Sequence, residues 1–189
     1  MILASSSRHR QALLQRLGLP FTVVAPEIDE TPRRGERPAE TAIRLAEAKA
    51  RAVAPKHPDA LIIGSDQVAE FSGQPVGKPR DSGHALELLQ TMRGHTVIFH
   101  TAVALLNART GVCRSALVDV VSSFRHLDDP VLQAYLDREQ PFDCAGSVKS
   151  EGLGIALFTR IASDDPTALI GLPLIRLIDL LAAEGVRPL

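Results

Sequence analysis

Two acidic positions in this 189-residue chain have the residue types and surroundings that metal-assisted or acid–base chemistry requires. Asp66 follows the apolar run 60–64, which is typical of an interior strand, so its carboxylate is expected at the carboxyl end of that strand. Open α/β sheets bind ligands in the crevice at that end, where a carboxylate can hold Mg²⁺ or Mn²⁺ or take a proton from water. The alternative, a helix cap or turn aspartate, fits less well because residues 67–69 continue a strand pattern.

The second acidic position is the pair Asp29 and Glu30, which follows a short strand pattern and Pro26. Taken alone, these two residues are more simply explained as solvated charges on a loop. Taken with Asp66, they give the chain two separate acidic sites near strand ends. Such sites suit hard divalent cations that also contact substrate phosphates.

The first ten residues predict a site for phosphate. Residues 1–4 have the pattern of a buried strand, a run of three serines follows at 5–7, and a helix opens at Arg8. A helix N-terminus presents oriented N–H groups and partial positive charge, and Arg10 adds a fork of donors that matches phosphate oxygens. Because there is no room for a signal peptide before this segment, the site is expected in a mature, cytosolic chain.

Two lysines and a glycine-rich loop are further candidates for contact with a ligand. Lys78 lies between Gly77 and Pro79, which fix the loop so that its ammonium group can point at an anion. Lys49 lies near the end of a long predicted helix and, by itself, would be interpreted as solvated. The loop 146–154 contains three glycines that let the backbone approach a ligand, but it lacks the Walker spacing.

Composition argues against several other classes of protein. The formal net charge is −1, so a nucleic acid is not expected as the main partner and a phosphate site must be a local cluster of basic residues. No apolar run reaches the ~18 residues that span a bilayer. Cys113 and Cys144 fit neither metal-ligand spacing nor a disulfide framework and are interpreted as small buried thiols in a reducing compartment. The six histidines show no metal-ligand spacing either.

A mixed α/β fold with a long antiparallel component must position these groups. The patterning predicts helices over 8–17, 38–53, 81–92, 128–138 and a last helix from 166 or 172 to 183. It predicts strands over 1–4, 21–24, 60–64, 96–107, 112–125 and 155–161, with a small excursion over 71–76. No internal repeat or linker interrupts this pattern, so one domain over residues 1–189 is expected.

Five motifs, in this order, resemble the Maf family of nucleoside triphosphate pyrophosphatases. They are Ala4-Ser5-Ser6-Ser7-x-x-Arg10, Asp29-Glu30-Thr31-Pro32, Arg44-Leu45-Ala46-x-x-Lys49-Ala50, Gly64-Ser65-Asp66-Gln67-Val68 and Gly77-Lys78-Pro79. The similarity extends through Gly171-Leu172-Pro173-Leu174 near the end of the chain. Five motifs in register are far more specific than any single one of them.

The resemblance implies a fold similar to Maf proteins and ITPases. That fold has a mixed sheet of long antiparallel strands, flanking helices and an active-site cleft between two lobes. It also implies a divalent cation, Mg²⁺ or Mn²⁺, at Glu30 and Asp66, with Asp66 as the proton acceptor. The residues that it implies in phosphate binding are Ser5, Ser7, Arg10, Lys49 and Lys78. A nucleoside triphosphate substrate and a homodimer follow from the same resemblance; neither a nucleic acid nor a membrane is an expected partner.

Within the family, the chain resembles the branch that hydrolyses 7-methyl-GTP. Gln67 and Glu151 stand where the dTTP/UTP branch typically has threonine and glutamine. Glu151 can accept hydrogen bonds from the N1–H and amino groups of guanine, whereas a pyrimidine would set a carbonyl against it. His9, Gln67 and Glu151 are therefore expected to read the base, with His9 standing where this branch often has an aromatic residue such as tryptophan.

The expected reaction is hydrolysis of 7-methyl-GTP to 7-methyl-GMP and pyrophosphate, which removes a non-standard nucleotide. Two alternatives stay open at this point. One is the same chemistry on dTTP and UTP, and the other is a non-catalytic nucleotide-binding regulator, since the family has been connected with septum formation. The presence of both Glu30 and Asp66 favours an enzyme, because a regulator could dispense with the acidic residues.

Overall fold

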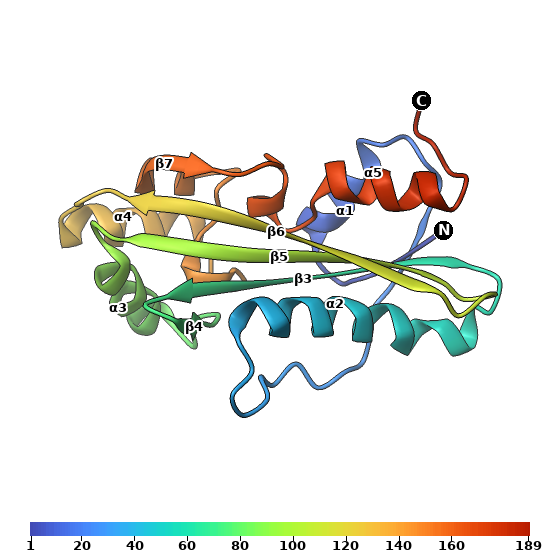
Figure 1. Cartoon of the computed structure of the whole chain (residues 1–189). Coiled ribbons are helices and arrows are strands. Elements are labelled where there is room, and N and C mark those ends of the chain that lie inside the picture. The colour runs from blue at the N-terminus through green and yellow to red at the C-terminus, as the bar shows by residue number, and fades with distance from the viewer.

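The computed structural model describes residues 1–189 and contains one seven-stranded mixed sheet with helices on both faces (Figure 1). The strand order is β2 (Thr22–Val24), β1 (Ile2–Ala4), β3 (Leu61–Phe71), β5 (Thr96–Asn107), β6 (Cys113–Phe124) and β7 (Phe158–Ala162), with β4 (Gln74–Val76) paired to β3. β1 is parallel to β2 and β3, and the other pairs are antiparallel. The predicted mixed α/β class with long antiparallel strands is confirmed.

Five α-helices flank the sheet: α1 (Arg8–Gln15), α2 (Pro38–Val53), α3 (Ser82–Met92), α4 (Asp129–Glu139) and α5 (Leu174–Ala183). In Figure 1, α2 runs along one face of the sheet, and α1 and α5 lie over the other face. α3 and α4 lie near the end of the long strands that is farther from α1 and α5. None of these helices combines the length and the apolar character needed to cross a bilayer.

Two hydrophobic cores lie on the sheet face opposite α2. One includes Leu13 of α1, Leu177 of α5 and Ile63 of β3, and the other includes Leu89 of α3 and Phe99 of β5. Odd-numbered residues of β3 and β5 point to this face, because successive side chains of a strand alternate between the two faces. The even-numbered residues of both strands therefore face α2.

Small residues let α2 approach β3 and β5 closely. Ala42 and Ala46 of α2 form a buried cluster with Ala102 and Ala104 of β5. A Cβ atom at Gly64 would lie only 2.0 Å from the carbonyl oxygen of Ala46, so no larger residue fits this position without a shift of the backbone. This close contact brings the polar side chains of α2 within reach of β3.

β3 is longer than its apolar run, and its neighbouring strands leave a groove in the sheet. The strand continues past Gly64 to Phe71, in keeping with the strand pattern predicted for residues 67–69. β1 pairs with it only as far as Gly64, and β4 pairs with it only from Ala69 onward. One edge of β3 over residues 65–68 is thus left without a neighbouring strand. Asp66 lies within the strand at this open edge, not at the strand's carboxyl end as predicted.

Another strand begins later than predicted. The strand predicted over 155–161 begins only at Phe158, because Leu153–Leu157 form a 3-10 turn. At Gly154 a Cβ atom would lie 2.4 Å from a backbone oxygen of the preceding loop, so the glycine permits this tight path. The last helix begins at Leu174, close to the later of its two predicted starts.

Candidate active site

A cleft of about 830 Å³ includes the open edge of β3 in its wall. Its other walls come from the loop before α1, from α2, from the loop after β4 and from the loop that follows α4. All residues predicted for the site line this cleft: Ser5, Ser7, His9, Arg10, Glu30, Lys49, Asp66, Gln67, Lys78 and Glu151. The structure therefore brings together residues from every part of the chain that the sequence analysis selected.

At one end of the cleft, two carboxylates converge on one buried lysine. Lys49 Nζ lies 2.6 Å from Asp66 Oδ1 and 3.0 Å from Glu30 Oε1. Asp66 is an even-numbered residue of β3 and faces α2, which explains how it reaches Lys49. The lysine is not the solvated helix residue that the sequence alone suggested, since it is only 5% exposed.

Burial shifts the protonation equilibrium of Asp66. It raises the pKa of this carboxyl above its usual value, and the nearby charges of Lys49 and Arg10 only partly oppose that effect. A carboxylate with a raised pKa accepts a proton more readily than an ordinary aspartate does. Asp66 is thus suited to take a proton from a bound molecule.

Arg10, which is half-buried, is the second cation beside Asp66. Its Nε donates a hydrogen bond of 2.8 Å to the carbonyl oxygen of Gly171, which fixes the guanidinium group against the segment before α5. Burial lowers the pKa of Arg10 from its usual value, while Asp66 and Glu30 act in the opposite direction. The Nη groups of the fork remain available for an anion in the cleft. We call Arg10, Glu30, Lys49 and Asp66 the Asp66 end of the cleft.

The start of α1 faces the same end. Ser7 is the N-cap, as predicted, and its Oγ accepts a hydrogen bond of 3.4 Å from the N–H of Arg10. Ser5 is buried, and its Oγ accepts from the N–H of Ser7 at 3.1 Å. The first turn of a helix leaves backbone N–H groups without helical partners, so this turn can donate to an anion.

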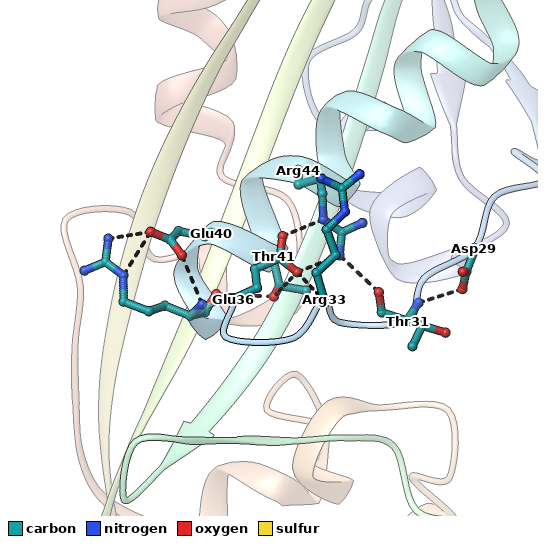
Figure 2. Close-up of polar contacts among 8 residues, drawn as sticks. Asp29, Thr31, Arg33, Glu36, Glu40, Thr41 and Arg44 are labelled. Atoms are coloured by element: carbon teal, nitrogen blue, oxygen red, sulfur yellow. Dashed lines mark hydrogen bonds and ion pairs between the residues drawn. The ribbon is translucent and has the colours of Figure 1, made fainter.

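A polar network ties the segment around Glu30 to α2 (Figure 2). Arg44 of α2 contacts Glu36 at 2.5 and 2.7 Å and donates to the carbonyl oxygen of Thr31 at 3.2 Å. These hydrogen bonds lower the pKa of Glu36 to about 2. Asp29 closes a turn by accepting from the N–H of Thr31 at 2.9 Å. Of the predicted acidic pair, Asp29 thus has a structural contact, and Glu30 reaches the site.

On the other face of β3, polar side chains fill the gap between the two cores. Gln67 Nε2 donates to Thr101 Oγ1 at 2.9 Å and to the carbonyl oxygens of Ala168 and Leu169 at 3.0 Å. Ser65 Oγ lies 2.9 Å from the carbonyl oxygen of Gly171. These contacts hold the segment before α5 against the strand. The amide nitrogen of Gln67 is therefore engaged by the protein, and its predicted contact with a base stays a prediction.

The opposite end of the cleft is formed by α1 and the loop after α4. His9 Nδ1 lies 2.6 Å from Glu151 Oε1. Asp143 and Cys144 lie beside His9, and the sequence analysis did not select these two residues for the site. No local spacing could have revealed them, because His9 is brought to them only by the tertiary fold. We call His9, Asp143, Cys144 and Glu151 the Glu151 end of the cleft.

The cysteines differ from their prediction. Cys113 and Cys144 are both free but half-buried, not buried. Burial and the neighbouring Asp143 raise the pKa of Cys144 to about 12, so its thiol is protonated at neutral pH.

The Asp66 end has the donor set of a hard divalent cation. Glu30 and Asp66 offer carboxylate oxygens, the ligands that Mg²⁺ and Mn²⁺ prefer. Lys49 contacts only one oxygen of Asp66, and no other hydrogen bond from the chain reaches this carboxylate. Glu30 is half exposed, with 53% of its side chain accessible, so it can turn toward an ion. The residues present therefore fit the expected metal.

Comparison with known proteins finds one family and several relatives over nearly the whole chain. A family model described as Maf-like protein matches residues 1–184. A 7-methyl-GTP pyrophosphatase of Aromatoleum aromaticum is 55% identical over 186 residues, covering 98% of this chain and 96% of that protein. A protein of the same name from Ralstonia nicotianae is 57% identical over 181 residues, covering 96% of this chain and 93% of the other.

The similarity to a solved structure is weaker than the similarity to these relatives. The HAM1 protein from Coxiella burnetii matches with a TM-score of 0.48 and 18% identity over 67% of this chain and 73% of that one, too little to carry an argument.

Proposed function

Because the chain belongs to the Maf family, we propose that it hydrolyses a nucleoside triphosphate to the monophosphate and pyrophosphate, with 7-methyl-GTP as substrate. The observation that carries the proposed chemistry is the convergence of Asp66 and Glu30 on Lys49 beside the N-terminus of α1. Relatives named 7-methyl-GTP pyrophosphatase, more than 50% identical over nearly the whole chain, support the proposed substrate.

The Asp66 end would bind the triphosphate. The buried Lys49 and the half-buried Arg10 are cations at the cleft wall, and Lys78 approaches from the loop after β4. That loop is held in place by a hydrogen bond of 3.1 Å from the N–H of Gly146 to the carbonyl oxygen of Gly77. With Ser5 and the first turn of α1, these groups would stabilise the negative charge that develops on the leaving pyrophosphate.

Asp66 would act as the proton acceptor. Its raised pKa and its position at the open edge of β3 let it take a proton from the water that attacks the α-phosphorus. The new bond joins the water oxygen to that phosphorus, and the bond to the pyrophosphate oxygen breaks. Lys49 fixes the carboxylate through Oδ1, which leaves Oδ2 for the proton.

Glu30 and Asp66 would hold the divalent cation, Mg²⁺ or Mn²⁺. When bound, such a cation neutralises charge on phosphate oxygens and orients the substrate. The network of Arg44 with Glu36 and Thr31 would keep Glu30 in place for this task.

The Glu151 end would read the base. The Glu151 carboxylate can accept from the N1–H and amino groups of a guanine, and it is anionic, which suits a methylated guanine that carries positive charge. His9 would orient Glu151 through their 2.6 Å contact. Gln67 would contact the base from β3, between the two ends of the cleft.

The remaining proposals concern the oligomeric state, the binding partner and the cellular location. We infer a homodimer from the family resemblance and a cytoplasmic protein whose partner is a nucleotide and not a nucleic acid or a membrane. The near-zero net charge supports the second inference. Light scattering on the purified chain tests the first: a mass near one chain would contradict it.

The test of the function is pyrophosphate release from a panel of plain and modified nucleotides with Mg²⁺ or Mn²⁺. Preferred turnover of 7-methyl-GTP is the expected result. Preferred turnover of dTTP and UTP would assign the same chemistry to pyrimidines. Nucleotide binding without any turnover would contradict an enzyme and favour a regulator.

A further inference from the structure

The Glu151 end contains a group of metal-ligating side chains, two of which have no part in the proposed reaction. A ring nitrogen of His9, a carboxylate oxygen of Asp143 and Sγ of Cys144 all lie within 4.8 Å of one another. His9 belongs to α1, and the other two residues belong to the loop after α4, so the group joins two walls of the cleft. We propose that His9, Asp143 and Cys144 form a Zn²⁺ site.

The spacing of the three ligands suits this ion. At Zn²⁺ bond lengths of about 2.0–2.3 Å, tetrahedral ligand atoms lie about 3–4 Å apart. Cys144 Sγ already lies 3.5 Å from Asp143 Oδ1, to which its thiol donates. The ring nitrogen of His9 lies within 4.8 Å of both atoms, so only a small movement separates it from this spacing. Binding breaks the S–H bond, releases the proton to solvent and forms the Zn–S bond, and nothing is oxidised or reduced.

Glu151 supplies the orientation that a ligating histidine requires. It contacts His9 at Nδ1 with a distance of 2.6 Å, which leaves Nε2 as the ring nitrogen with a free lone pair. In protein zinc sites a ligating histidine commonly donates its other ring N–H to a carboxylate, which fixes the tautomer and the plane of the ring. The pair of Glu151 and His9 has this arrangement before any ion is bound.

The ligand types separate this site from the one at the Asp66 end. Glu30 and Asp66 offer only oxygen, which suits Mg²⁺ and Mn²⁺. Nitrogen, sulfur and carboxylate oxygen together favour Zn²⁺. Three protein ligands leave a fourth position for water, and the cleft gives solvent access, since 29% of the His9 side chain is exposed.

The site also has a consequence for turnover, which rests on the proposed function. Zn²⁺ at His9 would place positive charge beside the Glu151 carboxylate, where the cationic base of 7-methyl-GTP is expected. Zn²⁺ should therefore inhibit the enzyme by competition with the base.

The direct test is binding of Co²⁺ and Zn²⁺ to the full chain without nucleotide. Co²⁺ reports a thiolate ligand by a charge-transfer band in the near ultraviolet, and Zn²⁺ should displace it. We expect one such site in the wild type and in Cys113→Ser, whose cysteine lies outside the cleft, and no band in Cys144→Ser. Glu151→Gln should keep the band but weaken Zn²⁺ binding by about 10- to 100-fold.

A wild-type chain without the band, or a Cys144→Ser chain that keeps it, would overturn the proposed site. Circular dichroism of each variant confirms that the fold is retained. Because these measurements need no turnover, the zinc site and the pyrophosphatase function can fail independently. In the activity assay, Zn²⁺ should inhibit Cys113→Ser as it inhibits the wild type. Equal inhibition of Cys144→Ser would overturn the inferred competition at the base.

Discussion

The two ends of the cleft are built from different kinds of structure. At the Asp66 end, Lys49 and Asp66 lie on a helix and a central strand, and their side chains are 7% and 8% exposed. At the Glu151 end, one wall is an irregular loop, and the side chains of His9 and Glu151 are 29% and 27% exposed. Lys49 and Asp66 are thus held by packed elements of the core, although Glu30 at the same end lies on an exposed loop, and the Glu151 end is held by a few polar contacts at the surface.

This difference matches two different demands on the molecule. Transfer of a phosphoryl group depends on charges held in fixed positions, which rigid elements provide. Recognition of a base must differ between enzymes that share this chemistry, and loops on a rigid scaffold can vary without damage to the core. We therefore expect changes at the Asp66 end to affect all substrates and changes at the Glu151 end to affect the choice among them.

The largest effect is expected for Asp66→Asn. Loss of the proposed proton acceptor should lower kcat by about 10²- to 10⁴-fold, measured as pyrophosphate release. The amide is similar in shape to the carboxylate, so the circular dichroism spectrum should not change. A variant that retains most of its activity would refute the assigned role.

Gly64→Ala tests whether the Asp66 end depends on the close contact of α2 with β3. The new Cβ would collide with the carbonyl oxygen of Ala46, so the free energy of unfolding should fall by about 3 kcal/mol in urea titrations. Gly77→Ala is the control, because no atom lies within 4 Å of its added Cβ, and it should change this free energy by less than about 0.5 kcal/mol. Equal stability of the two variants would contradict this packing.

Glu30→Gln and Asp29→Asn compare adjacent acidic residues with different contacts. Glu30→Gln should raise the Mg²⁺ or Mn²⁺ concentration for half-maximal activity by at least about 10-fold. Loss of a residue that only orients a metal ligand already weakens metal binding by this factor, and Glu30 is itself a proposed ligand. Asp29→Asn keeps the oxygen that accepts from Thr31, and its metal dependence should stay close to that of the wild type. A larger rise in the required metal concentration for Asp29→Asn than for Glu30→Gln would mean that Asp29, and not Glu30, binds the metal.

The smallest effect is expected for Glu36→Gln, which weakens the network shown in Figure 2. The pKa of Glu36 is depressed to about 2 in the folded chain, so its stabilising contribution is complete above its ordinary pKa near 4.5. It is lost as the pH falls toward 2. Glu36→Gln should therefore be less stable than the wild type by about 1 kcal/mol at pH 7, and the difference should shrink at pH 3. A difference that grows on acidification would contradict this assignment.

The sequence predicted the Asp66 end well because its groups follow regular elements. The apolar run before Asp66 and the Ser7 helix cap are local signals, and both helix and strand formed as expected. The burial of Lys49 could not be predicted from its own helix, because it depends on the missing side chain at Gly64 of another element. The open edge beside Asp66 depends on β1 stopping at Gly64 while β3 stays paired with β5, which is again a property of more than one element.

The Glu151 end was harder to predict. Its loop residues have no periodicity, and Leu153–Leu157, which formed part of a predicted strand, follow a 3-10 path permitted by neighbouring glycines. Spacing along the chain excluded His9 and Cys144 as metal ligands, although the fold places them together with Asp143. Contacts between residues so distant in sequence leave no local pattern.

The division of the cleft is tested most directly by one ratio, kcat/KM for 7-methyl-GTP over kcat/KM for UTP. It should be measured in the wild type, Asp66→Asn and Glu151→Gln. The account predicts that Asp66→Asn lowers both values and leaves the ratio unchanged, whereas Glu151→Gln shifts the ratio toward UTP by about 10- to 200-fold. A ratio that changes in Asp66→Asn, or that stays constant in Glu151→Gln, would contradict the separation of chemistry from recognition.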